Sequence, residues 1–232
     1  MRRFSAVLPF VFLALSPLAL AEINPKLNCV SVTVSPLDAS NPNAAINVNL
    51  TFHNGCGKDI TAVGFHLHPN EGTDWSIGWD FANLLGQPEE RRQNNDILHA
   101  DATMSQEVAR NSAQQGKIRA STAYVVFMDC TSVGDAQLIT QVVRYRRDQI
   151  SIYEQQEEML AEVVDRDQAR TFLSENHDDL KGINKMLLKE LRTRVEQLTP
   201  SQWTEFIQER QAHAKRLVST FETHSVVTLP AS

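Results

Sequence analysis

The sequence lacks most of the motifs that are commonly used to predict the function of a protein. Only three of its 232 residues are cysteine, and no pair has the CxxC spacing, which excludes a four-cysteine zinc site and a thioredoxin-like redox pair. No HExxH zinc motif and no GxSxG nucleophile elbow occurs. Basic residues are also in deficit, with 22 Lys and Arg against 28 Asp and Glu and a net charge of −6. We therefore expect no nucleic-acid partner.

One long apolar run is present, and it lies at the N-terminus. Two arginines precede a run from Phe4 to Leu20, and a small-x-small cleavage site ends at Ala21. This order is typical of a secretory signal peptide, and the run is short for a bilayer-spanning helix. We expect residues 1–21 to be removed, so that the mature chain starts at Glu22. The protein would then be periplasmic or secreted, with no membrane span after cleavage.

The three cysteines predict one disulfide and one leftover thiol in an oxidising compartment. If the strand that follows Cys29 pairs antiparallel with Ile46–His53, then Cys29 lies near Cys56 in the next turn. We favour a Cys29–Cys56 disulfide with Cys130 as the free thiol. A Cys56–Cys130 bond is the main alternative.

Between Asn28 and Thr131 the apolar residues recur with a period of two, which is typical of half-buried strands. The predicted strands are CVSVTV, AINVNLTFHN, TAVGFHL, DWSIGWDF and STAYVVFM, with two weaker ones between Asp96 and Arg110. The segment Asn83–Asn95 is a predicted polar loop. About seven short strands with no helix between them predict an antiparallel Ig-like β-sandwich over residues 26–131.

After Thr131 the period becomes that of α-helices. A first long helix has the apolar stripe Leu138, Ile139, Val142, Val143, Ile150, Tyr153, Leu160 and Val164, and a second has Leu180, Ile183, Leu187, Leu191, Val195 and Leu198. A third helix begins at LTPSQW, where Thr199 and Gln202 can form a capping box. The predicted fold is α+β: the sandwich, about three helices over residues 132–224, and a loose tail over residues 225–232.

Three histidines are the candidate metal ligands. His66 and His68 lie two apart on the polar face of a predicted strand, and His53 lies across the preceding turn; Asp59, Glu71 and Asp74 could add oxygens. Because no spaced ligand set is present, we interpret the histidines as a solvated pair and expect no metal and no cofactor.

Two other motifs have structural explanations. Asn54-Gly55 begins a glycine-rich stretch, but the residues around it do not fit a phosphate-binding loop, and it predicts a turn instead. The row Arg144, Arg146 and Arg147 could bind an anion, yet beside Asp148 it is more typical of a solvated helix face, where Arg146→Ala would cost under about 0.5 kcal/mol.

The stretch FHNGCGKDITAVGFHL resembles the "N-G-S-G-K-x-I-T-A" hairpin of exported bacterial proteins found chiefly in acidobacteria. YVVFMDCTSVGDAQLITQVVRYRRDQ resembles their later segment, a strand "A-V-V-F-E-D-G", then "G-D", then a helix with arginines. The resemblance covers Leu27 to Gln149 and departs at Cys56 and Cys130, where serine and glycine are usual. It implies a sandwich followed by helices, with no established activity and no catalytic residue to carry over.

A second resemblance concerns Leu198-Thr199-Pro200-Ser201-Gln202, which resembles the LTxxQ motif of all-helical periplasmic chaperones of the Spy and CpxP type. Those proteins carry the motif twice, and this chain carries it once. The sequence thus predicts an exported, non-catalytic cell-envelope binding or structural module that acts on an unidentified protein or envelope ligand. The alternative is a periplasmic helical chaperone or stress sensor. A third hypothesis is a metal-dependent hydrolase that uses His66 and His68.

Overall fold

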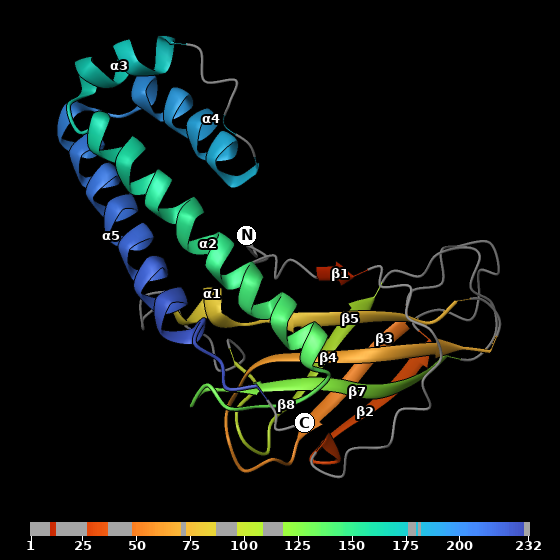
Figure 1. The fold of residues 1–232 in the computed structure, drawn as a ribbon. Helices are drawn as coiled ribbons and strands as arrows, with labels where there is room; N and C mark the ends of the chain where they lie inside the picture. Colours follow the sequence, from red (N-terminus) through yellow and green to blue (C-terminus); the bar gives the residue numbers. More distant parts are fainter. Residues whose placement is uncertain are drawn as a thin grey trace. The chain divides into compact units, whose positions relative to one another are not determined.

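The structure, a computed structural model, describes residues 10–12, 27–36, 48–70, 73–86, 97–108, 118–175, 180 and 182–229. The chain forms two compact units. Unit 1 comprises residues 1–84, 92–143 and 226–232, and unit 2 comprises residues 85–91 and 144–225. The fold is α+β, with two antiparallel sheets followed by helices (Figure 1).

Unit 1 contains both sheets. Sheet A has the strand order β1 (Phe10–Phe12), β5 (Trp75–Asp80), β4 (Ile60–Pro69), β7 (Ile118–Phe127) and β8 (Ser132–Gly134). Sheet B has the order β2 (Val30–Pro36), β3 (Val48–Asn54) and β6 (Thr103–Val108). A short helix, α1 (Ala82–Leu85), follows β5. All pairings within the two sheets are antiparallel.

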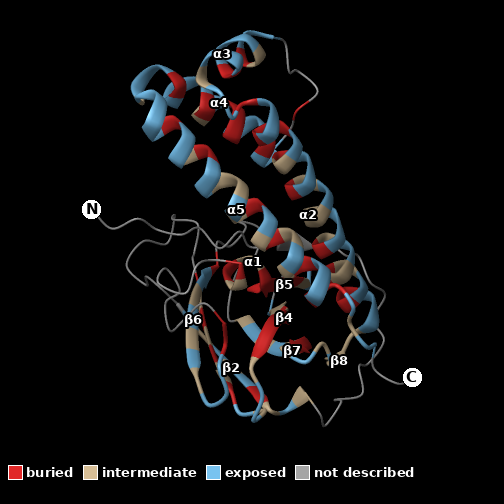
Figure 2. Cartoon of the chain, turned by 90° about the vertical axis from the view of Figure 1, so that its left-hand side faces the viewer, coloured by how far each residue is buried: buried red, intermediate tan, exposed pale blue. Residues whose placement is uncertain are grey.

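The two sheets pack against each other through aromatic side chains. Burial alternates along β3, as its sequence period predicts, and Phe52 is fully buried. The Phe52 ring lies 5.0 Å from that of Phe65 on β4 and 5.6 Å from that of Trp79 on β5. Burial of these large rings stabilises the packing between the two sheets. The buried inner residues appear red in Figure 2.

The turn that starts at Asn54 connects the two sheets and does not close a hairpin. β3 belongs to sheet B and β4 to sheet A, so the strands on either side of the turn are not paired. The buried Asn54 amide donates to the carbonyl oxygens of Lys58, Leu98 and His99, each at 2.9 Å, and accepts from the Cys56 N–H at 3.0 Å. The turn prediction is confirmed, but the hairpin implied by the resemblance is wrong.

Between Asp96 and Arg110, where two strands were predicted, the described residues 97–108 contain one, β6. The other feature there is a single bridge between Leu98 and Ile60. The predicted loop 83–95 lies mostly outside the described residues.

The disulfide joins Cys29 and Cys56, with 4.7 Å between their Cα atoms, as predicted. β2 and β3 pair antiparallel with Val30 opposite Asn54, and this pairing places the start of β2 beside the turn that carries Cys56. Cys130 is partly buried and is not disulfide-bonded. The bond therefore ties the first strand of sheet B to the connection between the sheets.

Peptide mapping of the oxidised protein under non-reducing conditions is expected to recover one linked pair, Cys29 with Cys56. Cys130 should be alkylated without prior reduction, and faster after unfolding, because its side chain is outside the disulfide and partly buried. A linked peptide that contains Cys130 would contradict this connectivity.

Within the described residues, four helices follow the sheets of unit 1, where about three were predicted. They are α2 (Ala136–Glu162), α3 (Arg166–Ser174), α4 (Gly182–Gln197) and α5 (Pro200–His224). The additional helix is α3, which has nine residues and whose N-cap Asp165 accepts hydrogen bonds from the backbone N–H groups of Asp167 and Gln168. Its buried face consists of only Ala169 and Leu173, too short a pattern to stand out. Across the described residues, none of the helices combines the length and apolarity needed to cross a bilayer.

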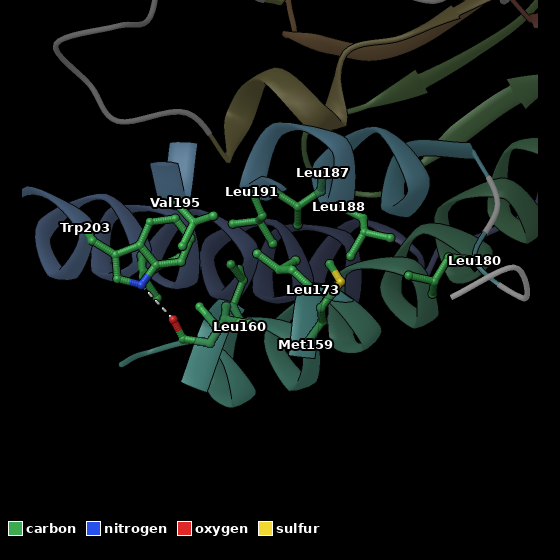
Figure 3. Close-up of a cluster of buried hydrophobic side chains, with 12 residues drawn as sticks. Met159, Leu160, Leu173, Leu180, Leu187, Leu188, Leu191, Val195 and Trp203 are labelled. Carbon is green, nitrogen blue, oxygen red and sulfur yellow. Dashed lines mark hydrogen bonds between the residues drawn. The ribbon is translucent and has the colours of Figure 1, made fainter. Parts of the chain in front are cut away.

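The core of unit 2 lies between these helices (Figure 3). Its buried residues are Met159, Leu160, Val163, Ala169, Leu173, Leu180, Leu187, Leu188, Leu191, Val195, Trp203 and Ile207. The predicted start of α5 is confirmed: Thr199 caps the helix and Gln202 completes the capping box. The Trp203 indole N–H donates to the Val163 carbonyl oxygen at 2.9 Å.

Three residues contradict the predicted helix faces. Val164 and Ile183 were expected on buried stripes but are 42% and 38% exposed. Arg146 was expected on a solvated face but is fully buried, and its Nη1 donates to the His224 carbonyl oxygen at 2.6 Å. The reason is periodicity: Arg146 follows Val142 by four residues and precedes Tyr153 by seven, so it lies on the apolar stripe. Arg144 and Arg147 are exposed.

The segment after α5 is attached to unit 1 over residues 226–229, where a loose tail was expected. The Thr228 N–H donates to the Cys130 carbonyl oxygen at 2.9 Å, and Ser132 Oγ donates to the Thr228 carbonyl oxygen. Val227 packs against buried residues of unit 1. Residues 132–134, placed in the predicted helical region, form β8 and pair with β7.

Candidate functional site

The candidate site lies on the outer face of sheet A, the face turned away from sheet B. Along β4, Ala62, Gly64, His66 and His68 alternate with the inward residues Val63, Phe65 and Leu67. The first turns of α2 cover one end of this face, where Leu138, Ile139 and Val142 pack with Ala62, Tyr124 and Val126. Burial from Ile60 to Phe65 is therefore continuous, whereas His66 and His68 are only partly buried.

Two glycines on this face make room for Tyr124, which is 2% exposed. A Cβ atom at Gly64 would lie 2.1 Å from Tyr124 Cε1, and one at Gly78 would lie 2.2 Å from the Tyr124 hydroxyl oxygen. The tyrosine ring thus lies across β4 and β5, which are paired at these two glycines. Glycine within strands often marks such a close approach, so Gly64 and Gly78 are a sequence signal from which this contact could have been predicted, although it was not.

Gly64→Ala is expected to lower the free energy of unfolding by about 1–3 kcal/mol, because the new methyl group would overlap the buried Tyr124 ring. Urea unfolding measures the change. Tyr124→Leu removes the overlapped ring atoms, so adding it to Gly64→Ala should cost less than the sum of the two single changes. Additive effects would show that Gly64 is not needed for the tyrosine.

Five polar side chains, here called the histidine cluster, lie beside the covered region: His66, His68, Asp74, Ser76 and Ser121. His66 Nδ1 is 2.8 Å from Ser76 Oγ. His68 Nδ1 is 2.8 Å from Asp74 Oδ2, and His68 Nε2 is 3.3 Å from Ser121 Oγ. The two imidazole rings lie 6.2 Å apart. Strand pairing explains the cluster, because β5 presents Ser76 and β7 presents Ser121 directly opposite His66.

The remaining predicted ligands lie elsewhere. His53 is on sheet B, where its Nδ1 is 3.2 Å from Thr103 Oγ1. Asp59 accepts a hydrogen bond from the Ala100 N–H at 2.9 Å and lies 3.2 Å from His99 Nδ1. Glu71 lies outside the described residues. In the part of the chain that the structure describes, no three His, Cys, Asp or Glu side chains are grouped so that they could hold a metal ion.

Burial lowers the pKa of His66 below its ordinary value. Asp135 opposes this shift, since its negative charge favours the imidazolium, whereas the neighbouring His68 lowers the pKa further. Asp135 is itself held at the start of α2, where Oδ1 accepts from the backbone N–H groups of Gln137 and Leu138. Near neutral pH, His66 is therefore a neutral hydrogen-bonding group.

This lowered pKa predicts that His66 makes the fold less stable in acid. In the unfolded chain His66 has its ordinary pKa of about 6.5, so as the pH falls it takes up a proton at a higher pH than it does in the folded protein. The stability that the folded state has with neutral His66 is therefore fully present above about pH 6.5 and is lost as the pH falls below that value. His66→Gln should flatten the decline in unfolding free energy between about pH 7 and 5, as measured by urea unfolding at each pH. An unchanged slope would contradict the lowered pKa.

The chain Asp74, His68, Ser121 has the order of an acid, a base and a hydroxyl, as in serine hydrolases. Those enzymes also aim paired donors at the oxyanion and hold the substrate in a cleft. Here the Asp74 and His68 side chains are 53% and 38% exposed. The cluster therefore offers hydrogen-bonding groups on an open sheet surface, an arrangement suited to binding a polar partner.

A cavity of about 300 Å³ occurs in unit 2, lined by Val164, Asp165, Arg166, Asp167, Pro200 and Thr204. Its polar groups already have partners within unit 2: Asp165 caps α3, and Arg166 Nε donates to the Val195 carbonyl oxygen at 2.8 Å. The histidine cluster thus remains the stronger candidate. Comparisons of the chain with protein-family models, with curated proteins and with solved structures find no match.

Proposed function

We propose that this protein is an exported, non-catalytic binding or structural module of the cell envelope. The observation that carries the proposal is the Cys29–Cys56 disulfide. Structural disulfides persist in oxidising compartments and are rare in reducing ones. The bond agrees with the signal-peptide features of residues 1–21, which point to export independently.

The strand order supports an Ig-like sandwich as the binding scaffold. In Ig-like domains with strands A to G, one sheet holds A, B and E, and the other holds C, F and G. Counted from β2, strands one, two and five form sheet B, whereas strands three, six and seven belong to sheet A, with strand four beside strand three. β-Sandwiches of this kind carry many unrelated binding functions, so the scaffold supports a binding module without naming its ligand.

Export is tested by producing the full chain in a bacterial host and analysing the periplasmic fraction. The expected product has the intact mass of a chain that starts at Glu22 and contains one disulfide. A cytoplasmic product that keeps residues 1–21 and has Cys29 and Cys56 reduced would refute the proposal.

The non-catalytic part of the proposal is tested on the histidine cluster. The purified protein and its Ser121→Ala variant should hydrolyse nitrophenyl esters at the same rate, no faster than free imidazole at matched concentration. His68→Ala should lower this rate by no more than the share of one imidazole group. A rate that falls at least about tenfold in Ser121→Ala would instead favour acyl transfer by the Asp74, His68 and Ser121 chain.

A helical chaperone is the second candidate, and its specific observation is the LTPSQ motif. In this chain the motif forms the capping box of α5: the Thr199 N–H donates to Gln202 Oε1 at 3.0 Å, and Thr199 Oγ1 caps the first turn. Local helix chemistry thus accounts for the motif, so the envelope module is the better-supported proposal.

A further inference from the structure

The edge of sheet A at β5 is covered by one short strand. β1 pairs antiparallel with β5, with Phe10, Val11 and Phe12 opposite Gly78, Ile77 and Ser76 (Figure 1). β1 lies within residues 1–21, the segment whose removal on export is proposed above. Among the described strands, removal would leave β5 with β4 as its neighbour, and the backbone N–H and C=O groups of residues 76–78 that face β1 would lose the partners that β1 supplies.

The residues of β5 define what can replace β1. Ile77 and Trp79 are buried, 4% and 2% exposed, on the inner face of sheet A. Residues directly opposite each other in paired strands share a face. A strand that pairs as β1 does must therefore place an apolar side chain opposite Ile77, where it extends the core. The segment that the structure seats there, Phe10-Val11-Phe12, consists of apolar residues only.

Charge disfavours a second copy of β5 as the occupant. Two β5 strands paired antiparallel around Ile77 would place Asp74 of each copy opposite Asp80 of the other. Like charges directly opposite each other destabilise a strand pair. An apolar segment without carboxylates avoids this repulsion.

We propose that the β5 edge of the processed protein is a docking site for an extended, apolar polypeptide strand, which adds to sheet A in the register that β1 occupies. The partner class is an exposed apolar segment of another chain, bound mainly through backbone hydrogen bonds. The inference rests on the proposed export, because the edge opens only when residues 1–21 are removed.

The test compares the full chain with the chain that starts at Glu22. Hydrogen exchange of the amides in Trp75–Asp80 that face β1 should be slow in the full chain and at least about tenfold faster in the processed chain, because an unpaired edge amide exchanges freely. The amides that face β4 should keep their protection and serve as an internal control. A synthetic peptide, Phe-Val-Phe-Leu flanked by lysines, should restore protection to the processed chain. It should bind the full chain at least about tenfold more weakly, as measured by fluorescence anisotropy.

The matched control peptide carries aspartate at the position opposite Ile77 and should bind the processed chain at least about tenfold more weakly, because a buried charge is costly. Equal binding of the two peptides, or equal binding by the two chains, would overturn the proposal. Protection of Trp75–Asp80 that grows with protein concentration alone would assign the edge to a second copy and would also overturn it.

A second variant keeps the test independent of how the processed chain folds. In the full chain, Val11→Pro should speed exchange in Trp75–Asp80, since proline disrupts the pairing of β1, and should make the edge available to the peptide. Unchanged exchange and unchanged peptide binding would show that β1 does not cover β5. The intact mass of the exported protein reports separately on removal of residues 1–21, so failed export and a failed docking site give different results.

Discussion

Arg146→Ala is expected to lower the free energy of unfolding by about 3–5 kcal/mol. The guanidinium is fully buried in unit 2, and its Nη1 donates to the His224 carbonyl oxygen in the last turn of α5. Alanine would leave a cavity and would remove a donor from a buried carbonyl group. It would also remove a positive charge from the C-terminal end of a helix, where cations are favourable.

Urea unfolding followed by circular dichroism at 222 nm measures this loss. Arg147→Ala is the matched control, because Arg147 is the exposed neighbour on the same helix, and it should change the unfolding free energy by less than about 0.5 kcal/mol. Arg146→Met keeps most of the side-chain volume but removes the hydrogen-bond donor. Its loss of unfolding free energy should therefore lie between those of Arg146→Ala and Arg147→Ala. If Arg146→Ala and Arg147→Ala have equal effects, Arg146 does not hold the end of α5.

Trp203→Ala is expected to cost about 3–5 kcal/mol. Trp203 is fully buried in the core of unit 2, and its indole N–H donates to the Val163 carbonyl oxygen at the end of α2 (Figure 3). The truncation would therefore remove a large buried ring and leave the Val163 carbonyl group without this donor. The expected result is a lower urea midpoint with an unchanged slope.

Two variants separate these effects. Trp203→Phe keeps an aromatic ring and loses the donor, so it should cost about 1–2 kcal/mol. Met186→Ala, at an apolar residue of α4 that is 71% exposed, should cost less than about 0.5 kcal/mol. A Trp203→Ala variant as stable as Met186→Ala would contradict the packing of this core.

The sequence by itself determined the features that depend on near neighbours in the chain. Alternation along Val48–Asn54 predicted a strand with one buried face, because side chains point to opposite faces at successive residues. The run from Leu198 to Trp203 predicted the start of α5, because capping involves residues only three positions apart. The Cys29–Cys56 bond followed from a single assumed strand pair, which the structure contains.

Only the tertiary structure decided which distant residues meet. The residues of the turn at Asn54 do not show whether the two flanking strands pair with each other. That depends on which other strands β3 and β4 pair with, and the structure places them in different sheets. Arg146 looked solvated because charge normally indicates a surface, but in the interior it donates to a carbonyl oxygen 78 residues away in the chain. Strand register likewise places Asp74 and Ser121 beside His68. Long-range hydrophobic packing sets this register, and a local sequence pattern does not encode it.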